Sequence, residues 1–148
     1  MKKAFTMIEL IFVIVILGIL AAVAIPKLAA TRNDAQVAKV AQNIMTGASE
    51  IAAYAVSQGK TSTDLKLMSN GMLNLELSGD AVLSSKKAVI KMGGVSDCVT
   101  LQILTSTNDD NLTLSFGTAG GDTKCLALQS KIDAARYPMK LRGVYVAE

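Results

Sequence analysis

Residues 1–26 read MKKAFTMIELIFVIVILGILAAVAIP and place one acidic side chain inside a long apolar stretch. As a helix, the 21 residues from Phe5 to Ile25 would rise about 31 Å, close to the hydrocarbon thickness of a bilayer. Only Thr6 and Glu9 are clearly polar within this stretch. A carboxylate at membrane depth costs roughly 2.5–3.5 kcal/mol, and more when it is unpaired. The sequence therefore predicts a membrane-spanning helix in which Glu9 has a partner.

The stretch AFTMIEL, residues 4–10, resembles the processing site of type IV pilins and of the pseudopilins of type II secretion. In that family a short basic leader is cut off on the cytoplasmic side, directly before a Phe. The prepilin peptidase that makes the cut then methylates the new amine, and a Glu stands at the fifth mature position. The resemblance implies a leader at residues 1–4, cleavage between Ala4 and Phe5, N-methylation of Phe5 and an assembly role for Glu9.

Two further landmarks of the family fall in register, because Gly18 and Pro26 stand where its first helix usually has a Gly and a Pro. The chain departs from the family at Ala4, where most members have Gly. The close match covers about the first thirty residues, and the rest agrees only in architecture.

Glu9 has a physical explanation that does not depend on the resemblance. Cleavage before Phe5 creates a cationic amine four residues from the carboxylate, near enough for the two groups to neutralise each other within one helix. In a fibre, Glu9 could instead meet the amine of a neighbouring subunit and set the axial register. The alternative is a tolerated polar residue near a helix end, whose side chain reaches the headgroups.

A conventional secretory signal peptide is a second alternative. Lys2-Lys3, the apolar stretch and Ala22-Val23-Ala24 fit such a signal, and its cut would release a soluble protein that begins at Ile25. An acidic residue inside the apolar region is unusual for a signal peptide, and the helical pattern runs through the proposed cut. Both features favour the membrane-anchored interpretation.

Charge alone leaves the orientation undecided, because cations stand on both sides of the span. Lys2 and Lys3 precede it, whereas Lys27, Arg32 and Lys39 follow it. The resemblance implies a single-pass protein of the bacterial inner membrane with a cytoplasmic N-terminus and a periplasmic head. It also implies a filament that spans the periplasm or reaches the cell surface.

Composition excludes several classes of function. The chain has 148 residues, room for one ordinary domain, and a net charge of +3 that falls to +1 without Lys2 and Lys3. Its basic residues are scattered and no aromatic stripe accompanies them, so we expect no nucleic-acid partner. There is no His, which excludes Ser-His and Cys-His nucleophile systems. We therefore expect no enzymatic activity.

The helix continues beyond Pro26 as an amphipathic segment at residues 27–58. Its apolar positions recur at three- and four-residue steps: Leu28, Ala35, Val37, Val40, Ala41, Ile44, Ala48, Ile51, Ala52 and Ala55. Pro26 is expected to kink or open the helix locally, and Gly59 to end it. A continuous helix over residues 5–58 would have 54 residues and a length of about 80 Å.

The remaining residues, 59–148, predict a globular head. Residues 60–85 indicate a loop with one short helix, capped by Thr63 or Asp64 and ended at Asn70-Gly71. Alternating patterns predict strands at 88–92, 98–104, 112–116 and 141–146, and a helix at 124–135. The expected fold is α+β and pilin-like, a long N-terminal helix packed against a small antiparallel sheet.

The two cysteines, Cys98 and Cys125, lie in the part that the resemblance places in the periplasm, where disulfides persist. A bond between them closes a loop of 28 residues, worth about 3.6 kcal/mol on the chain-entropy estimate. The resemblance supports this pairing, since many pilins have a disulfide in their C-terminal half. Metal binding is the weaker alternative, because two Cys without His leave the coordination sphere half empty.

Carboxylates gather at Asp109-Asp110, with Asp122 nearby in sequence. The simplest interpretation is solvated turn residues beside Asn and Gly. A calcium site is the alternative, because some major pseudopilins of type II secretion bind calcium in this part of the fold. Their ligands do not match this chain residue by residue. The loop at residues 117–121 lacks the Lys-Ser/Thr of a phosphate-binding loop.

The favoured function is a structural subunit of a pilus-like filament, specifically a type II secretion pseudopilin. Its expected partners are further copies of itself, other pilin-like subunits, the prepilin peptidase, the assembly platform of the inner membrane, and lipid. A type IV or competence pilin is one alternative. A membrane-anchored binding protein that never polymerises is another, with the head as its active part.

Overall fold

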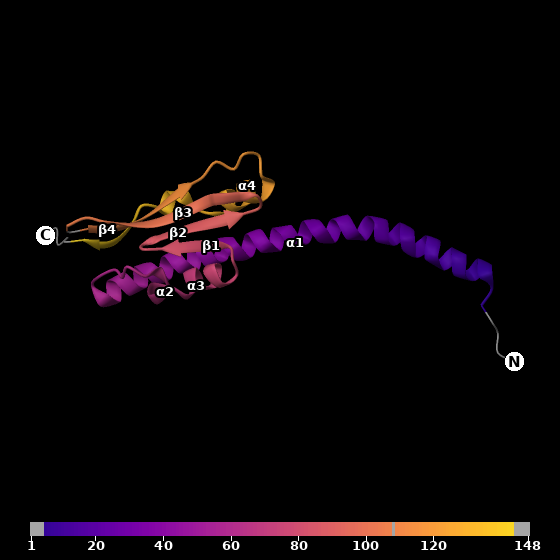
Figure 1. Cartoon of the computed structure of the whole chain (residues 1–148), viewed down its shortest axis with the longest axis horizontal. Coiled ribbons are helices and arrows are strands. Elements are labelled where there is room, and N and C mark those ends of the chain that lie inside the picture. Colours follow the sequence, from indigo (N-terminus) through magenta and orange to yellow (C-terminus); the bar gives the residue numbers. More distant parts are fainter. Residues whose placement is uncertain (1–4, 108, 144–148) are drawn as a thin grey trace. The chain divides into compact units, whose positions relative to one another are not determined.

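A computed structural model describes residues 5–107 and 109–143. The chain forms two compact units, residues 1–35 and residues 36–148, and the division falls inside one helix. That helix, α1, spans Met7–Gln58 (Figure 1). The final strand was predicted to continue to residue 146, and residues 144–146 lie outside the described part.

Helix α1 confirms the long predicted helix and its C-terminal boundary. Gly59 follows the last helical residue with φ of +66°, the left-handed conformation that commonly ends a helix. Pro26 lies inside α1, which continues on both sides of it. The expected kink at this residue stays a prediction. Burial begins only in the second unit, at one face that the sequence largely predicted: Val37, Val40, Ala41, Ile44, Gly47, Ala48, Ile51 and Ala55. Leu28 and Ala35, predicted on this face, are exposed.

Residues 60–85 contain more structure than the sequence predicted. Asp64 caps helix α2, Leu65–Met68, as expected, but a second helix, α3, spans Asn70–Leu77. The prediction that Asn70-Gly71 ends a helix was wrong, because these residues begin α3. The Ser69 side chain accepts a hydrogen bond from the Met72 amide and so caps α3.

Close approach of α3 to α1 depends on two glycines. A Cβ atom on Gly71 would lie 2.8 Å from the Asn43 carbonyl oxygen and 2.9 Å from the Gly47 amide nitrogen. The Glu50 carboxylate of α1 accepts hydrogen bonds from the Ser69 hydroxyl (2.7 Å) and the Gly71 amide (2.9 Å). Helix α3 therefore receives part of its N-terminal capping from α1.

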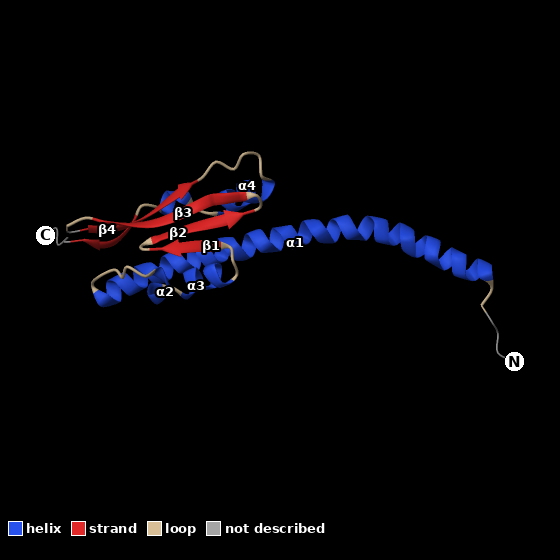
Figure 2. Ribbon diagram, viewed as in Figure 1, coloured by secondary structure: helices blue, strands red, loops and turns tan. Residues whose placement is uncertain are grey.

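The sheet is an antiparallel meander of five strands in chain order, as the short separations predicted (Figure 2). The strands are β1, Ala81–Ser84; β2, Lys87–Met92; β3, Val95–Thr105; β4, Asp109–Phe116; and β5, Met139–Gly143. Strand β1 was missed, since four residues are too short to show an alternating pattern. Strand β4 starts earlier than expected, so Asp109 to Asn111 belong to a strand instead of a turn.

One face of the sheet completes the hydrophobic core with α1. Buried side chains alternate along β2, β3 and β4, and those facing inward include Ala88, Ile90, Val99, Leu101, Ile103 and Leu112. The pattern places every second residue of these strands on the opposite face. This confirms the α+β fold, a long helix packed against an antiparallel sheet.

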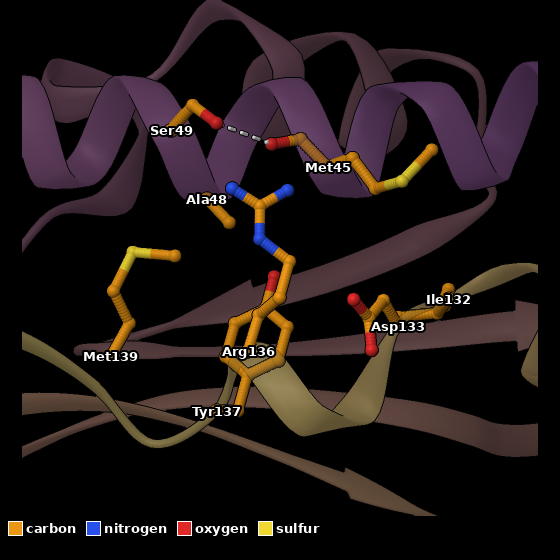
Figure 3. A pocket seen from close by; sticks show the side chains of 8 residues that line it. All are labelled: Met45, Ala48, Ser49, Ile132, Asp133, Arg136, Tyr137 and Met139. Atoms are coloured by element: carbon orange, nitrogen blue, oxygen red, sulfur yellow. Dashed lines mark hydrogen bonds between the residues drawn. The ribbon is translucent and has the colours of Figure 1, made fainter.

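The late helix is shorter than predicted. Helix α4 spans Thr123–Lys131, and a 3₁₀ turn, η1, follows at Ala134–Arg136. The Asp133 side chain accepts a hydrogen bond from the Ala135 amide, which stabilises the 3₁₀ turn in place of a continued helix. A pocket lies between this segment and α1, with Arg136 and Tyr137 facing Ala48 and Ser49 (Figure 3). Burial raises the pKa of the Tyr137 phenol.

Candidate functional site

The first turn of α1 is closed by Thr6 and Glu9. The Glu9 Oε2 atom accepts hydrogen bonds from the Thr6 amide and the Thr6 hydroxyl, both at 2.8 Å. The Glu9 amide donates to the Thr6 hydroxyl oxygen at 3.4 Å. This is a capping box, in which a Thr and the Glu three residues later each satisfy the other's backbone N–H. It explains why α1 begins at Met7, whereas the sequence predicted a start at Phe5.

The capping box gives Glu9 a partner within its own chain. The signal was readable in the sequence, since T-x-x-E is the capping-box pattern, but the prediction of a partner considered only the amine of Phe5. Within the described residues, all hydrogen bonds to the Glu9 carboxylate use Oε2. Its Oε1 atom accepts no hydrogen bond from these residues.

The apolar side chains around Glu9 have no packing role within the chain. Phe5 is 86% exposed, Ile8 75% and Leu17 58%. Helix α1 is the one helix in the described residues that is long and apolar enough to cross a membrane, and its most apolar 18-residue window is 0% buried. A core helix of a soluble protein would be mostly buried, and this segment is not.

The remaining predicted landmarks can be placed only in part. A Cβ atom on Gly18 would meet nothing within 4 Å, so the folded chain itself does not require glycine there. Pro26 lies in the middle of α1. Ala4, the residue before the predicted cut, lies outside the described residues.

Residues 1–25 match the family model described as the prokaryotic N-terminal methylation motif. This motif is the hallmark of type IV pilin-like proteins. A search of curated proteins and a search of solved structures each found no match.

The pilin-like motif and the exposed helix together indicate membrane anchoring. The motif also implies assembly with other pilin subunits and processing by a prepilin peptidase. Pilin-like proteins are structural and not enzymatic.

The head contains the predicted disulfide. Cys98 in β3 and Cys125 in α4 are both buried and bonded, with an S–S distance of 2.00 Å. The Gln129 amide group reinforces the junction, donating to the carbonyl oxygens of Cys98 and Gly117, each at 2.9 Å. Helix α4 is thus attached to the sheet by one covalent bond and two hydrogen bonds.

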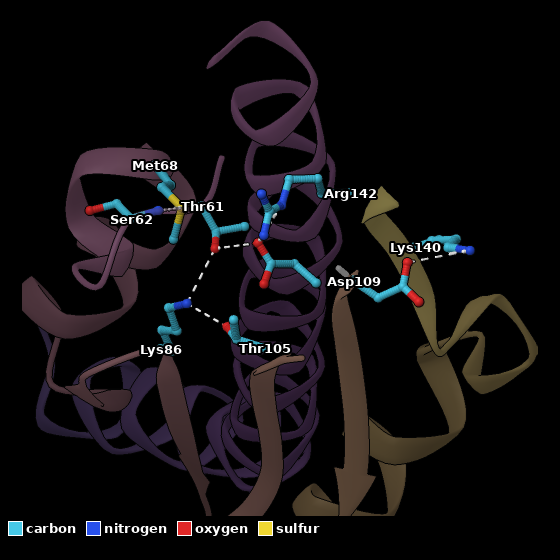
Figure 4. A network of polar contacts seen from close by, with 9 residues as sticks. Thr61, Ser62, Met68, Lys86, Thr105, Asp109, Lys140 and Arg142 are labelled. Atoms are coloured by element: carbon cyan, nitrogen blue, oxygen red, sulfur yellow. Dashed lines mark hydrogen bonds and ion pairs between the residues drawn. The ribbon is translucent and has the colours of Figure 1, made fainter. Parts of the chain in front are cut away.

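The carboxylates that suggested a calcium site have separate roles. Asp122 caps α4, accepting from the Cys125 amide at 2.8 Å and from the Gly94 amide at 3.0 Å. The hydrogen bonds from these two amides lower the pKa of Asp122, and the Gly94 amide has the larger effect. Asp109 in β4 forms an ion pair with Lys140 in β5 at 3.6 Å (Figure 4). Within residues 5–107 and 109–143, no three His, Cys, Asp or Glu side chains are grouped to hold a metal ion. The expectation of no cofactor, with calcium as the alternative, stays a prediction.

Asp110 differs from the solvated turn residue that the sequence suggested, because it is only 2% exposed. Its Oδ2 atom accepts from the Thr61 hydroxyl at 2.8 Å and pairs with the Arg142 guanidinium at 3.4 Å. Burial raises the pKa of Asp110. The hydroxyls of Thr61 and Thr105 and the charges of Lys86 and Arg142 outweigh burial, so the pKa lies below its ordinary value.

Proposed function

We propose that the chain is a structural subunit of a pilus-like filament, specifically a type II secretion pseudopilin. It is cut between Ala4 and Phe5, methylated on Phe5, and assembled from the inner membrane through residues 5–26. The observation that supports this proposal is the apolar helix within the methylation motif, none of which is buried. Such a surface is stable in lipid or against other copies of itself.

Assembly in this proposal is a transfer of helices from lipid to a shared core. Glu9 then selects the register. Its Oε2 atom stays in the capping box with Thr6, and its Oε1 atom meets the Phe5 amine of a neighbouring subunit. A misregistered subunit leaves a buried carboxylate unpaired, and breaking a buried ion pair in this way typically costs about 3–5 kcal/mol.

The first test is the intact mass and N-terminal sequence of the protein recovered from membranes of its native cells. We expect a chain that begins at Phe5 and is one methyl group heavier than its sequence. A chain that begins at Ile25 would contradict the proposal and establish a secreted soluble head. An Ala4→Gly variant should be processed at least as well, whereas a bulky residue at position 4 should block the cut.

The capping box allows the charge of Glu9 to be tested separately from its capping role. Gln also serves at this position of a capping box, so Glu9→Gln keeps the helix start and removes the charge. Thr6→Ala removes the side-chain cap and keeps the charge. We expect Glu9→Gln, Glu9→Ala and Thr6→Ala to insert normally into the membrane. The two Glu9 variants should lose most filaments, whereas Thr6→Ala should still form them. Unaltered filament yield from Glu9→Gln would refute the ion-pair role.

The same filament preparation separates the alternatives. Filaments confined to the periplasm support the pseudopilin assignment, whereas surface filaments support a type IV or competence pilin. A processed chain that stays a monomer in the membrane would support the anchored binding protein instead.

A further inference from the structure

One short motif in β4 has no role in the proposed assembly. Residues 109–113 read Asp-Asp-Asn-Leu-Thr, so Asn111 and Thr113 form an Asn-x-Thr acceptor sequence without proline between them. Asp109 stands two positions before the asparagine, which extends the motif to the acidic five-residue form that bacterial oligosaccharyltransferases use. Such a motif has meaning only in a chain segment exported from the cytoplasm.

The structure places Asn111 on the face of the sheet that points away from the core. Its neighbours in β4, Asp110 and Leu112, are buried, whereas Asn111 is partly exposed. The positions opposite Asn111 are Leu104 in β3 and Lys140 in β5, and both are exposed. Within the described residues, the Asn111 amide group makes no hydrogen bond. A substituent on this nitrogen would therefore extend into solvent without displacing a core side chain.

The strand order also leaves the motif accessible to a modifying enzyme before β5 pairs with β4. In the folded sheet the Thr113 hydroxyl donates to the Gln102 carbonyl at 3.0 Å, and Asn111 lies between two paired strands. Strand β5 begins only at Met139, so β4 remains an edge strand until that later segment has been exported. The β4–β5 register also shifts between Asp110 and Asn111. Modification before β5 pairs is thus compatible with the final fold.

We propose that Asn111 is an acceptor for an N-linked glycan. The Asn111 amide nitrogen attacks the anomeric carbon of a sugar carried on a polyprenyl diphosphate. A C–N bond forms, the anomeric C–O bond breaks, the diphosphate leaves with the electron pair, and the amide loses one proton. This proposal rests on the periplasmic head of the proposed function. The glycan covers Leu104, a large apolar side chain that is 50% exposed directly opposite Asn111.

The test is peptide mass spectrometry on the reduced protein from its native cells. Trypsin yields residues 92–124 as one peptide, since no Lys or Arg lies between Lys91 and Lys124. We expect this peptide to be heavier than its sequence by a set of sugar residues located on Asn111. Asn111→Gln and Thr113→Ala should abolish the addition, whereas Thr113→Ser, the matched control, should retain it.

The outcomes separate this proposal from the proposed function. A peptide 92–124 at its unmodified mass, in a chain that begins at a methylated Phe5, overturns the glycan and leaves the filament subunit intact. An addition that persists in Thr113→Ala also overturns it, because that mass is not N-linked to this motif. A glycan on Asn111 in a chain that begins at Ile25 supports the modification and refutes the filament subunit.

Discussion

Removing the disulfide provides a quantitative test of how the head is stabilised. The bond joins residues 27 apart in sequence and therefore closes a loop of 28 residues, counting both cysteines. The chain-entropy relation gives about 3.6 kcal/mol for such a loop. For a domain of this size, that loss lowers the melting temperature by roughly 10–20 °C. The Gln129 hydrogen bonds to Cys98 and Gly117 remain, so α4 should still dock in the variant.

The assay is thermal unfolding of the full chain in detergent, followed by near-ultraviolet circular dichroism of its three tyrosines. The variant replaces both cysteines by alanine, because both sites are buried and a serine hydroxyl there would add its own cost. Ser96→Ala with Thr123→Ala is the matched control, since both residues are exposed and each lies two positions from a cysteine. The control should melt within roughly 2 °C of the wild type. A cysteine-free variant that also melts there would refute the reasoning.

Two further predictions concern the head. Gly71→Ala should destabilise it by about 1–3 kcal/mol in chemical denaturation, because the new Cβ would lie within 3 Å of α1 backbone atoms. Gly18→Ala, which meets nothing within 4 Å, should leave the midpoint unchanged; equal midpoints for both variants would contradict the packing argument. Stability should also fall as pH drops below about 4, since the pKa of Asp110 is lower in the folded chain than in the unfolded one. The unfolded chain then binds the proton first, and Asp110→Asn should show a shallower decline. An unchanged slope would show that other carboxylates control acid unfolding.

The features predictable from the sequence are those in which one residue type repeats over many positions. The long helix, the later strands and the disulfide follow from apolar periodicity, from Gly59 and from the presence of only two cysteines. Strand β1 was missed because four residues are too few to show a pattern, and helix α3 because its start depends on a tertiary contact. The start of α3 is stabilised by the Glu50 carboxylate of α1, twenty residues before Asn70 in the chain. The local sequence around Asn70 cannot indicate that Glu50 caps this helix.

The candidate site was predictable in its location and incomplete in its chemistry. Glu9 is conspicuous because it is charged in an apolar stretch, whereas Thr6 is unremarkable until its hydroxyl is seen beside that carboxylate. Asp110 shows the opposite case. A run of Asp beside Asn suggests a turn, but Thr61 and Arg142 come from distant segments to make burial of that carboxylate tolerable.

Burial in α1 begins at Val37, although the helix itself begins thirty residues earlier. The two parts of this one helix therefore contribute differently to the fold. A substitution before Ala35 replaces no buried side chain, so in the proposed filament subunit we expect its effects in membrane insertion and in assembly with neighbours. A substitution after Gln36 acts first on whether the head folds. Expression and solubility screens would detect substitutions after Gln36, because these affect folding. They would overlook substitutions before Ala35, where defects in the proposed assembly would be found.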